Sequence, residues 1–143
     1  MNKRRLSRGF TLIEIMIVVA IIALLAAVAV PSATRARKRG QAAGVLADAR
    51  LLNAAQEQFY TEYPDKIAGS TFGDQRVYVD KAAALYSRIV GTEAYDQMGN
   101  LFTGYVDTPG GPMVTISSTT FAALSDVAPS EYWEEYWNPA HAR

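Results

Sequence analysis

The chain has 143 residues, with 14 basic and 14 acidic side chains and therefore a formal net charge of zero. Residues 1–9 hold four of the basic side chains, so the remainder has 14 − 4 = 10 basic against 14 acidic ones, which argues against a protein dedicated to binding nucleic acid. The length suits one domain, and the absence of cysteine excludes disulfides and thiolate chemistry without excluding an extracytoplasmic location.

An apolar run from Phe10 to Val30 follows the basic segment 1–9, and only Thr11 and Glu14 in it are polar. At about 1.5 Å per residue a helix of this run spans about 31 Å, which matches the roughly 30 Å hydrocarbon core of a bilayer. Three interpretations are open. The run is a signal peptide cut near Ala27-Val28-Ala29, a plain single-span anchor, or an anchor whose leader is removed before the apolar run.

Glu14 is the unusual residue of this run. A charged carboxylate at the centre of a membrane helix costs on the order of 2.5–3.5 kcal/mol, and one that is kept there usually has a partner. It argues against a simple signal peptide, because a charge at the front of the apolar core weakens such a segment. Charge counting does not orient the span, since four basic residues lie on each side of it.

The predicted helix continues beyond the membrane. Pro31 can kink it and removes one backbone donor, but residues 35–63 are rich in good helix formers. One face of this second part is apolar except at a glutamine, and it consists of Val45, Ala49, Leu52, Gln56, Phe59 and Tyr63. Pro64 supplies a stop. The pattern predicts one helix of roughly 80 Å, whose first half needs lipid or other copies of the chain around it.

Two features of this helix have alternative explanations. Gly40 and Gly44 permit either a close approach of another helix or a flexible point, or they are tolerated weak positions that cost about 1 kcal/mol each relative to alanine. The basic residues at 35–39 can bind DNA or lipid headgroups, and we favour the simpler view that they mark a membrane interface or a solvated face.

The first part of the region after Pro64 predicts short elements around a loop. We expect a loop over residues 64–74, a short strand at residues 75–79, and a short helix over residues 80–90 that Asp80 caps. The apolar face of that helix consists of Ala82, Leu85, Tyr86 and Ile89.

The second part of this region predicts a β-hairpin and a last helix. Residues 101–106 and 113–117 look like strands, and the turn cluster "DTPGGP" lies between them. One or two helical turns follow, capped by Ser118 and ended by Pro129. The order of elements predicts an α+β fold, with one long N-terminal helix packed on a small antiparallel sheet with short helices.

No catalytic or metal-binding pattern stands out. His141 is the only histidine, and we expect it in a solvated tail. Asp96 and Asp107 are scattered, without the ligand spacing of a calcium loop, so we expect no metal, no cofactor and no enzyme activity. The tail carries four large aromatic side chains that either form an exposed recognition patch or, as we favour, complete the core: Tyr132, Trp133, Tyr136 and Trp137.

The segment from Gly9 to Glu14, "GFTLIE", after a short basic leader resembles the type IV prepilin family, which includes the pilins and the pseudopilins of type II secretion systems. A small residue precedes Phe10, the apolar run begins there, and Glu14 is the fifth residue counted from it. Pro31, the 22nd, fits the family's kink. The segment "DQMGN" resembles a "D-P-W-G-N-P" segment of major pseudopilins at its aspartate, glycine and asparagine, but lacks the prolines and the tryptophan.

The resemblance implies a pilin-like fold and a processed, assembled protein. A membrane peptidase would cut between Gly9 and Phe10 and methylate the new amine of Phe10, with the N-terminus in the cytoplasm and the head outside. Glu14 would then pair with that amine, either in a neighbouring subunit, which we favour, or within its own helix. The implied regions are a cleaved leader, a transmembrane and polymerisation helix containing Pro31, an amphipathic helix, and a globular head: 1–9, 10–31, 32–63 and 64–143.

The function that follows is a structural subunit of a type IV pilus-like or type II secretion pseudopilus filament. Its implied partners are copies of itself, related pilin subunits, a prepilin peptidase, an inner-membrane assembly platform and the lipid bilayer, with no nucleic acid. The implied location is the inner membrane as a single-pass protein, and then the filament. The alternative is a monomeric membrane-anchored protein that binds a ligand outside the cytoplasm.

Overall fold

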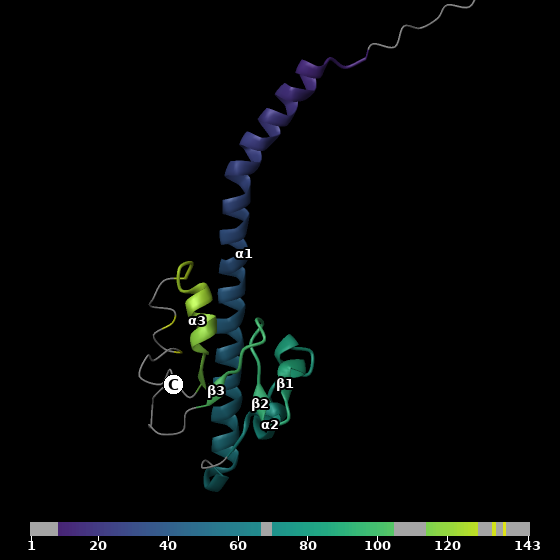
Figure 1. Cartoon of the computed structure of the whole chain (residues 1–143). Helices are drawn as coiled ribbons and strands as arrows, with labels where there is room; N and C mark the ends of the chain where they lie inside the picture. The colour runs from purple at the N-terminus through teal and green to yellow at the C-terminus, as the bar shows by residue number, and fades with distance from the viewer. Residues whose placement is uncertain (1–8, 67–69, 105–113, 129–132, 134–135, 137–143) are drawn as a thin grey trace, which may run out of the picture. The chain divides into compact units, whose positions relative to one another are not determined.

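The computed structural model describes residues 9–66, 70–104, 114–128, 133 and 136 (Figure 1). Most of the predicted leader 1–9, the turn cluster "DTPGGP", Asp107, Pro129, Tyr132, Trp137 and His141 lie outside these residues. The chain divides into two compact units, Met1–Ala36 and Arg37–Arg143.

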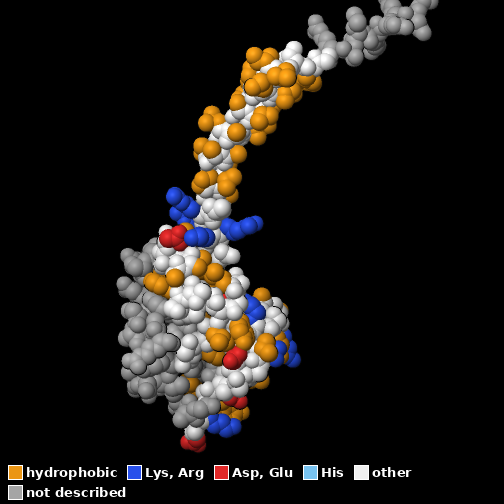
Figure 2. Space-filling model, in the orientation of Figure 1, with side chains coloured by type: hydrophobic (Ala, Val, Ile, Leu, Met, Phe, Trp, Pro, Cys, Tyr) orange, Lys and Arg blue, Asp and Glu red, His pale blue; other side chains and the backbone are white. Residues whose placement is uncertain are grey.

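The long helix α1 spans Leu12–Glu62, 51 residues, and Pro31 lies inside it. This confirms the predicted helix to within two residues at its start and one at its end. Every described side chain from residue 9 to residue 37 is exposed, and Figure 2 shows apolar side chains along this part of the helix. Its most apolar 18-residue window has a mean hydropathy of 3.0 with none of the window buried, so among the described helices α1 is long and apolar enough to cross a membrane.

The segments that follow α1 correct two predictions. The expected loop over 64–74 contains a 3-10 turn, Pro64–Lys66, and the start of α2, Phe72–Gln75. The expected strand at 75–79 is wrong, because a second 3-10 turn occupies Arg76–Tyr78. The guanidinium carbon of Arg76 lies 4.1 Å from the ring centroid of Tyr86, a contact between distant residues that the local β-branched pattern did not reveal.

The expected helix over 80–90 is also corrected. Only Ala84–Arg88 is helical, as a 3-10 turn, and it runs directly into strand β1, Ile89–Val90. Asp80 accepts a hydrogen bond from the backbone N–H of Ala82 at 2.9 Å and so forms a local turn instead of a helix cap. Leu85 and Ile89 are buried as expected, whereas Ala82 is exposed.

Two small antiparallel sheets complete the second unit. β1 pairs with β2, Glu93–Ala94, and the turn between them uses Gly91 at φ 61°, a left-handed conformation that favours glycine. The sequence did not predict this hairpin. β3, Thr103–Gly104, pairs with β4, Val114–Thr115, which confirms the predicted pairing with strands of two described residues each.

The last described helix, α3, spans Ser118–Leu124. Its cap is Ser117, one residue earlier than expected, because the Ser117 hydroxyl accepts from the backbone N–H of Thr120 at 3.1 Å.

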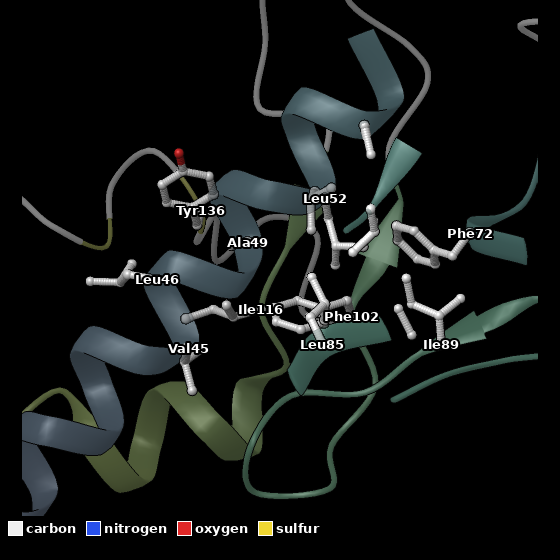
Figure 3. Close-up of a cluster of buried hydrophobic side chains, with 14 of the residues drawn as sticks. Val45, Leu46, Ala49, Leu52, Phe72, Leu85, Ile89, Phe102, Ile116 and Tyr136 are labelled. Atoms are coloured by element: carbon white, nitrogen blue, oxygen red, sulfur yellow. The ribbon is translucent and has the colours of Figure 1, made fainter. Parts of the chain in front are cut away.

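The core of the second unit lies between α1 and these short elements. Val45, Ala49 and Leu52 are fully buried, and Figure 3 shows them with side chains from β1 and from the segments around Phe102 and Ile116. The predicted apolar face ends one step early, since Tyr63 is 39 % exposed.

The aromatic tail contributes to this core where it is described. Trp133 is 1 % exposed and Tyr136 is 3 % exposed, and both belong to the cluster of buried side chains. For these two residues the core interpretation is confirmed. The architecture is the predicted α+β class, a long helix packed on small antiparallel sheets with short helices.

One buried ion pair connects α1 to the sheet side of the core. The Arg88 guanidinium donates two hydrogen bonds to the Asp48 carboxylate, at 2.7 Å and 3.0 Å. Their side chains are 20 % and 8 % exposed. Removing one partner of such a pair leaves an uncompensated charge, so the contact holds α1 to the 3-10 turn that precedes β1.

Candidate functional site

At the start of α1, Glu14 and Thr11 are connected by three reciprocal hydrogen bonds. Its Oε2 accepts from the backbone N–H of Thr11 at 2.8 Å and from the Thr11 hydroxyl at 2.7 Å. The Thr11 hydroxyl in turn accepts from the backbone N–H of Glu14 at 3.4 Å. This is the geometry of a capping box, which satisfies the first orphan donors of a helix. In this uncut chain the partner of Glu14 is therefore Thr11.

Sequence reasoning missed this role of Thr11, although the spacing Thr-x-x-Glu before an apolar run is a known signature of helix starts. Both bonds use the same carboxylate oxygen, and Oε1 of Glu14 accepts no hydrogen bond from the described residues. The carboxylate also lies in the first turn, at the positive end of the helix dipole. The cap thus fixes the carboxylate and leaves one oxygen available for a cation.

Gly9 and Phe10 precede the helix in exposed, non-helical chain. Phe10 is 84 % exposed, and a Cβ built on Gly9 meets nothing within 4 Å. The nitrogen of Phe10 is a peptide nitrogen here, so its pairing with Glu14 stays a prediction that requires a cut chain. The structure brings Gly9 and Phe10 next to the capping box and leaves the peptide bond between them accessible.

Pro31 interrupts the hydrogen bonding of α1 without ending the helix. It donates no backbone hydrogen bond, and two hydroxyls beyond it bond back to the chain. Ser32 donates to the Ala29 carbonyl at 2.8 Å, and Thr34 donates to the Pro31 carbonyl at 2.8 Å. These bonds pair both hydroxyls with backbone carbonyls at the end of the apolar run.

The basic residues at 35–39 include one that is paired within its own chain. Lys38 Nζ lies 3.0 Å from Oδ2 of Asp126, which follows α3, and the two side chains are 45 % and 61 % exposed. An exposed ion pair of this kind contributes little to stability. The cluster is a solvated surface as far as the described residues show.

The segment "DQMGN" forms a tight turn that is tied to α3. Asp96 Oδ1 accepts from the backbone N–H groups of Met98 at 2.8 Å and Asn100 at 2.9 Å, and its Oδ2 accepts from the Thr120 hydroxyl. Gly99 has φ 82°. The three residues that resemble the pseudopilin segment therefore build a turn, and no group of three metal-ligating side chains occurs among the described residues.

A hollow of about 420 Å³ lies at the end of α1. Phe59, Tyr63 and Tyr78 contribute aromatic rings to it. The Tyr78 hydroxyl donates to the Glu62 carboxylate, and this hydrogen bond raises the pKa of Tyr78 to about 12.

Comparisons with known proteins agree with the start of the chain. Residues 4–30 match the family model of the prokaryotic N-terminal methylation motif. The type IV major pilin protein PilA of Myxococcus xanthus is 33 % identical over 122 residues, which cover 85 % of this chain and 54 % of that protein.

Two further relatives match shorter stretches. The type IV major pilin protein PilE1 of Neisseria gonorrhoeae is 47 % identical over 58 residues, which cover 41 % of this chain and 33 % of that protein. The type IV wide pilus major component PilA4 of Thermus thermophilus is 63 % identical over 35 residues, which cover 24 % of this chain and 27 % of that protein. The chain thus spans about half the length of the first relative and a third or less of the others. No solved structure matches.

Proposed function

We propose that this chain, which belongs to the type IV prepilin family, is a structural subunit of a type IV pilus-like filament. The observation that carries the proposal is the N-terminal part of α1, where every described side chain from residue 9 to residue 37 is exposed although the run to Val30 is apolar. Such a surface needs lipid before assembly and protein after it. The relatives named as major pilins favour a pilus over a secretion pseudopilus.

Processing comes first in this proposal. A prepilin peptidase cuts between Gly9 and Phe10 and methylates the new amine of Phe10. The match to the N-terminal methylation motif over residues 4–30 and the open space around Gly9 support this step. A small residue at the cut leaves room for the peptidase.

Assembly follows from the charge of the new amine. The cut turns the Phe10 nitrogen into a cation, and Glu14 is an anion with one oxygen that Thr11 does not use. In the low-dielectric interior of a filament the two lower each other's desolvation cost when they pair. Glu14 of one copy therefore binds the Phe10 amine of the next.

The regions of the chain take these roles in turn. Residues 1–9 are the leader, residues 10–31 with Pro31 cross the inner membrane once and later polymerise, residues 32–63 form the amphipathic part, and residues 64–143 form the head outside the cytoplasm. The partners are other copies, related pilin subunits, the prepilin peptidase and the assembly platform of the inner membrane.

The test is expression together with a pilus assembly machinery. Mass spectrometry of the protein should give an N-terminus at Phe10 with one added methyl group, and electron microscopy should show filaments. Replacing Gly9 with a bulky residue should block the cut. A processed protein that stays in the membrane without filaments would favour the alternative, a monomeric anchored binding protein, and a mature N-terminus near Val30 would mean an ordinary signal peptide.

A further inference from the structure

A band of basic residues lies on α1 directly after the apolar run, and it consists of Arg35, Arg37, Lys38 and Arg39. Figure 2 shows Lys and Arg side chains gathered on the helix next to its apolar part. All three arginines are exposed, and none of them forms an ion pair with another described residue. Within the band only Lys38 has such a partner, Asp126. The band therefore presents three guanidinium groups that no described residue neutralises.

The band surrounds the helix over a short length. At about 100° per residue, the four side chains leave the axis in directions of about 0°, 200°, 300° and 40°, and they span about 6 Å along it. The polar headgroup layer of a bilayer is about 5–7 Å thick on each side. A membrane surface crossed by the helix would contact all four side chains, whereas an anion on one side of the helix would contact two or three of them.

The place of the band along α1 also suits a membrane surface. Arg35 is five positions beyond Val30, about 7.5 Å along the axis. Side chains of an α-helix lean towards its N-terminus, which here means towards the apolar run, so a long arginine side chain can bring its charge back to the edge of the hydrocarbon. The planar guanidinium group binds phosphate through two parallel hydrogen bonds. Lipid phosphate groups are thus within reach of the band.

The charge of the remaining chain argues against a nucleic acid as the partner of the band. Residues 40–143 hold 6 basic and 13 acidic side chains, a formal net charge of −7. An extended polyanion that reached the band from one side would be repelled by this charge. A headgroup layer needs to contact residues 35–39 alone, so the charge distribution favours the membrane as the partner.

We propose that Arg35, Arg37 and Arg39 bind the phosphate groups of anionic phospholipids at the outer surface of the membrane. This inference rests on the proposed function, in which residues 10–31 cross the inner membrane and the head lies outside the cytoplasm. Basic residues usually favour the cytoplasmic side of a span, but here the cut removes the four basic residues of the leader and leaves the band as the cationic flank of the span. Binding of anionic headgroups holds the processed subunit at one depth in the bilayer before it assembles.

Lipid-selective quenching tests the proposal on the full chain in vesicles. The natural chain contains no cysteine, so Ala33→Cys, at an exposed position between Val30 and the band, carries a single fluorophore. Phosphatidylglycerol and phosphatidylcholine with the same nitroxide label on an acyl chain are compared as quenchers. The fluorophore reports only the lipids next to residue 33, so lipids bound by the uncut leader on the other side of the bilayer do not contribute.

Phosphatidylglycerol should quench this fluorophore at a mole fraction that is lower than that of phosphatidylcholine by about fivefold or more, since each basic residue near an anionic surface contributes about this factor. The test variant replaces the three arginines of the band: Arg35→Gln, Arg37→Gln and Arg39→Gln. In it the two lipids should quench equally.

The matched control removes three exposed charges of the second unit instead: Arg50→Gln, Lys66→Gln and Lys81→Gln. It should keep the preference for phosphatidylglycerol. Equal quenching by the two lipids when the band is unchanged would overturn the proposal. So would a loss of preference in the control as large as that in the test variant, because net charge would then explain the result.

Salt provides a second measurement that needs no further variant. Raising sodium chloride from about 0.05 M to about 0.5 M should remove most of the preference, because salt screens exposed charges, and a preference that is independent of salt would contradict binding by the arginines. A gel shift of duplex DNA that the test variant loses, together with unchanged lipid quenching, would assign the band to nucleic acid.

Flotation of the vesicles separates this inference from the proposed function. A chain that floats with the vesicles but shows no lipid preference would overturn only the binding of lipid by the band. A chain that does not float with them would contradict the membrane span of the proposed function, and this inference with it.

Discussion

The two halves of α1 are one continuous helix, but their side chains meet different surroundings. Leu24 and Leu25 in the first half are 69 % and 65 % exposed, whereas Leu51 and Leu52 in the second half are 46 % and 0 % exposed. Adjacent leucines have similar exposed fractions where the helix is apolar on all sides, and very different ones where one face of the helix packs on the core. The comparison teaches that the first half is built for a uniform apolar solvent and the second for a partner on one side.

The polar residues follow the same division. In the first half Glu14 is bonded only to its near neighbour Thr11, so its hydrogen bonds are local. In the second half Asp48 is bonded to Arg88, forty positions away in the chain, and is buried. Local pairing would leave the first half free to change its surroundings in the proposed assembly, whereas the long-range pair connects the second half to the rest of its unit.

The largest predicted effect tests the first half of α1 and is the effect of Glu14→Gln on assembly. Glu14→Gln keeps a side-chain acceptor for Thr11, since glutamine also serves in a capping box, but it removes the charge. We expect normal insertion and a strong loss of assembly, because breaking a buried charge pair costs about 3–5 kcal/mol at each subunit. The measurement mixes mutant and unchanged subunits and counts their incorporation into filaments.

The control for this prediction is Thr11→Val, which removes the hydroxyl and keeps the carboxylate charge. It should weaken the cap by about 1 kcal/mol and reduce incorporation less than Glu14→Gln does. Equal incorporation of the Glu14→Gln subunit and the unchanged subunit would mean that Glu14 serves only its own helix.

The next effect sharpens the contrast between the two adjacent leucines. In a fragment spanning Arg37–Arg143, Leu52→Ala should lower the free energy of unfolding by about 3–5 kcal/mol, because it opens a cavity in the core. Leu51→Ala, next to it and half exposed, should cost less than about 1 kcal/mol. Urea denaturation followed by circular dichroism measures both. Similar losses for the two variants would mean that the face of α1 is assigned wrongly.

The titration of the Tyr78 hydroxyl tests the structure at the C-terminal end of α1. The hydrogen bond from Tyr78 to Glu62 raises the pKa of Tyr78 from 10.0 to about 12. Because the neutral hydroxyl is the bonded form, its contribution to stability is complete below pH 10.0 and is lost as the pH rises towards 12. The hydrogen bond to Glu93 also raises the pKa of Tyr95, so the ultraviolet absorbance of tyrosinate should show late titrations of both Tyr78 and Tyr95. Glu62→Gln should move one of them, that of Tyr78, to lower pH. Tyr78→Phe should remove that titration, and its persistence would assign it to another tyrosine.

The smallest effect concerns the two glycines of α1. A Cβ at Gly40 meets nothing within 4 Å, so Gly40→Ala should stabilise the fragment by about 1 kcal/mol. A Cβ at Gly44 would lie 2.3 Å from Nε2 of Gln97, so the Gln97 side chain must move and Gly44→Ala should gain little or nothing. Thermal unfolding compares the two. An equal gain at both positions would mean that the contact with Gln97 is unimportant.

Gly44 also decides a point that the sequence left open. The close approach at this glycine is made by Gln97 of the same chain and not by another helix. A Cβ at Gly40 meets nothing within 4 Å. Two of the original interpretations therefore stay open for Gly40: a tolerated weak position of the helix, or a site where a helix of another copy approaches closely.

The sequence by itself determined α1, its apolar first half and the buried face from Val45 to Phe59, because helix propensity, hydropathy and periodicity are local properties that a long segment repeats many times. The motif at Gly9–Glu14 pointed to the family for a similar reason, since its chemistry lies within six consecutive residues. The hairpin of β3 and β4 was also predictable, because two strand-like segments lie on either side of a cluster of turn residues.

Only the tertiary structure decided the short elements of the head. Residues 75–79 have the side chains of a strand, but the chain there turns helically, with Arg76 over the ring of Tyr86. The packing of α2 depends on Gly73, where a Cβ would lie 2.1 Å from the carbonyl oxygen of Gly91. Elements of two to five residues hold too few local interactions to specify their own conformation, so contacts with distant segments choose it.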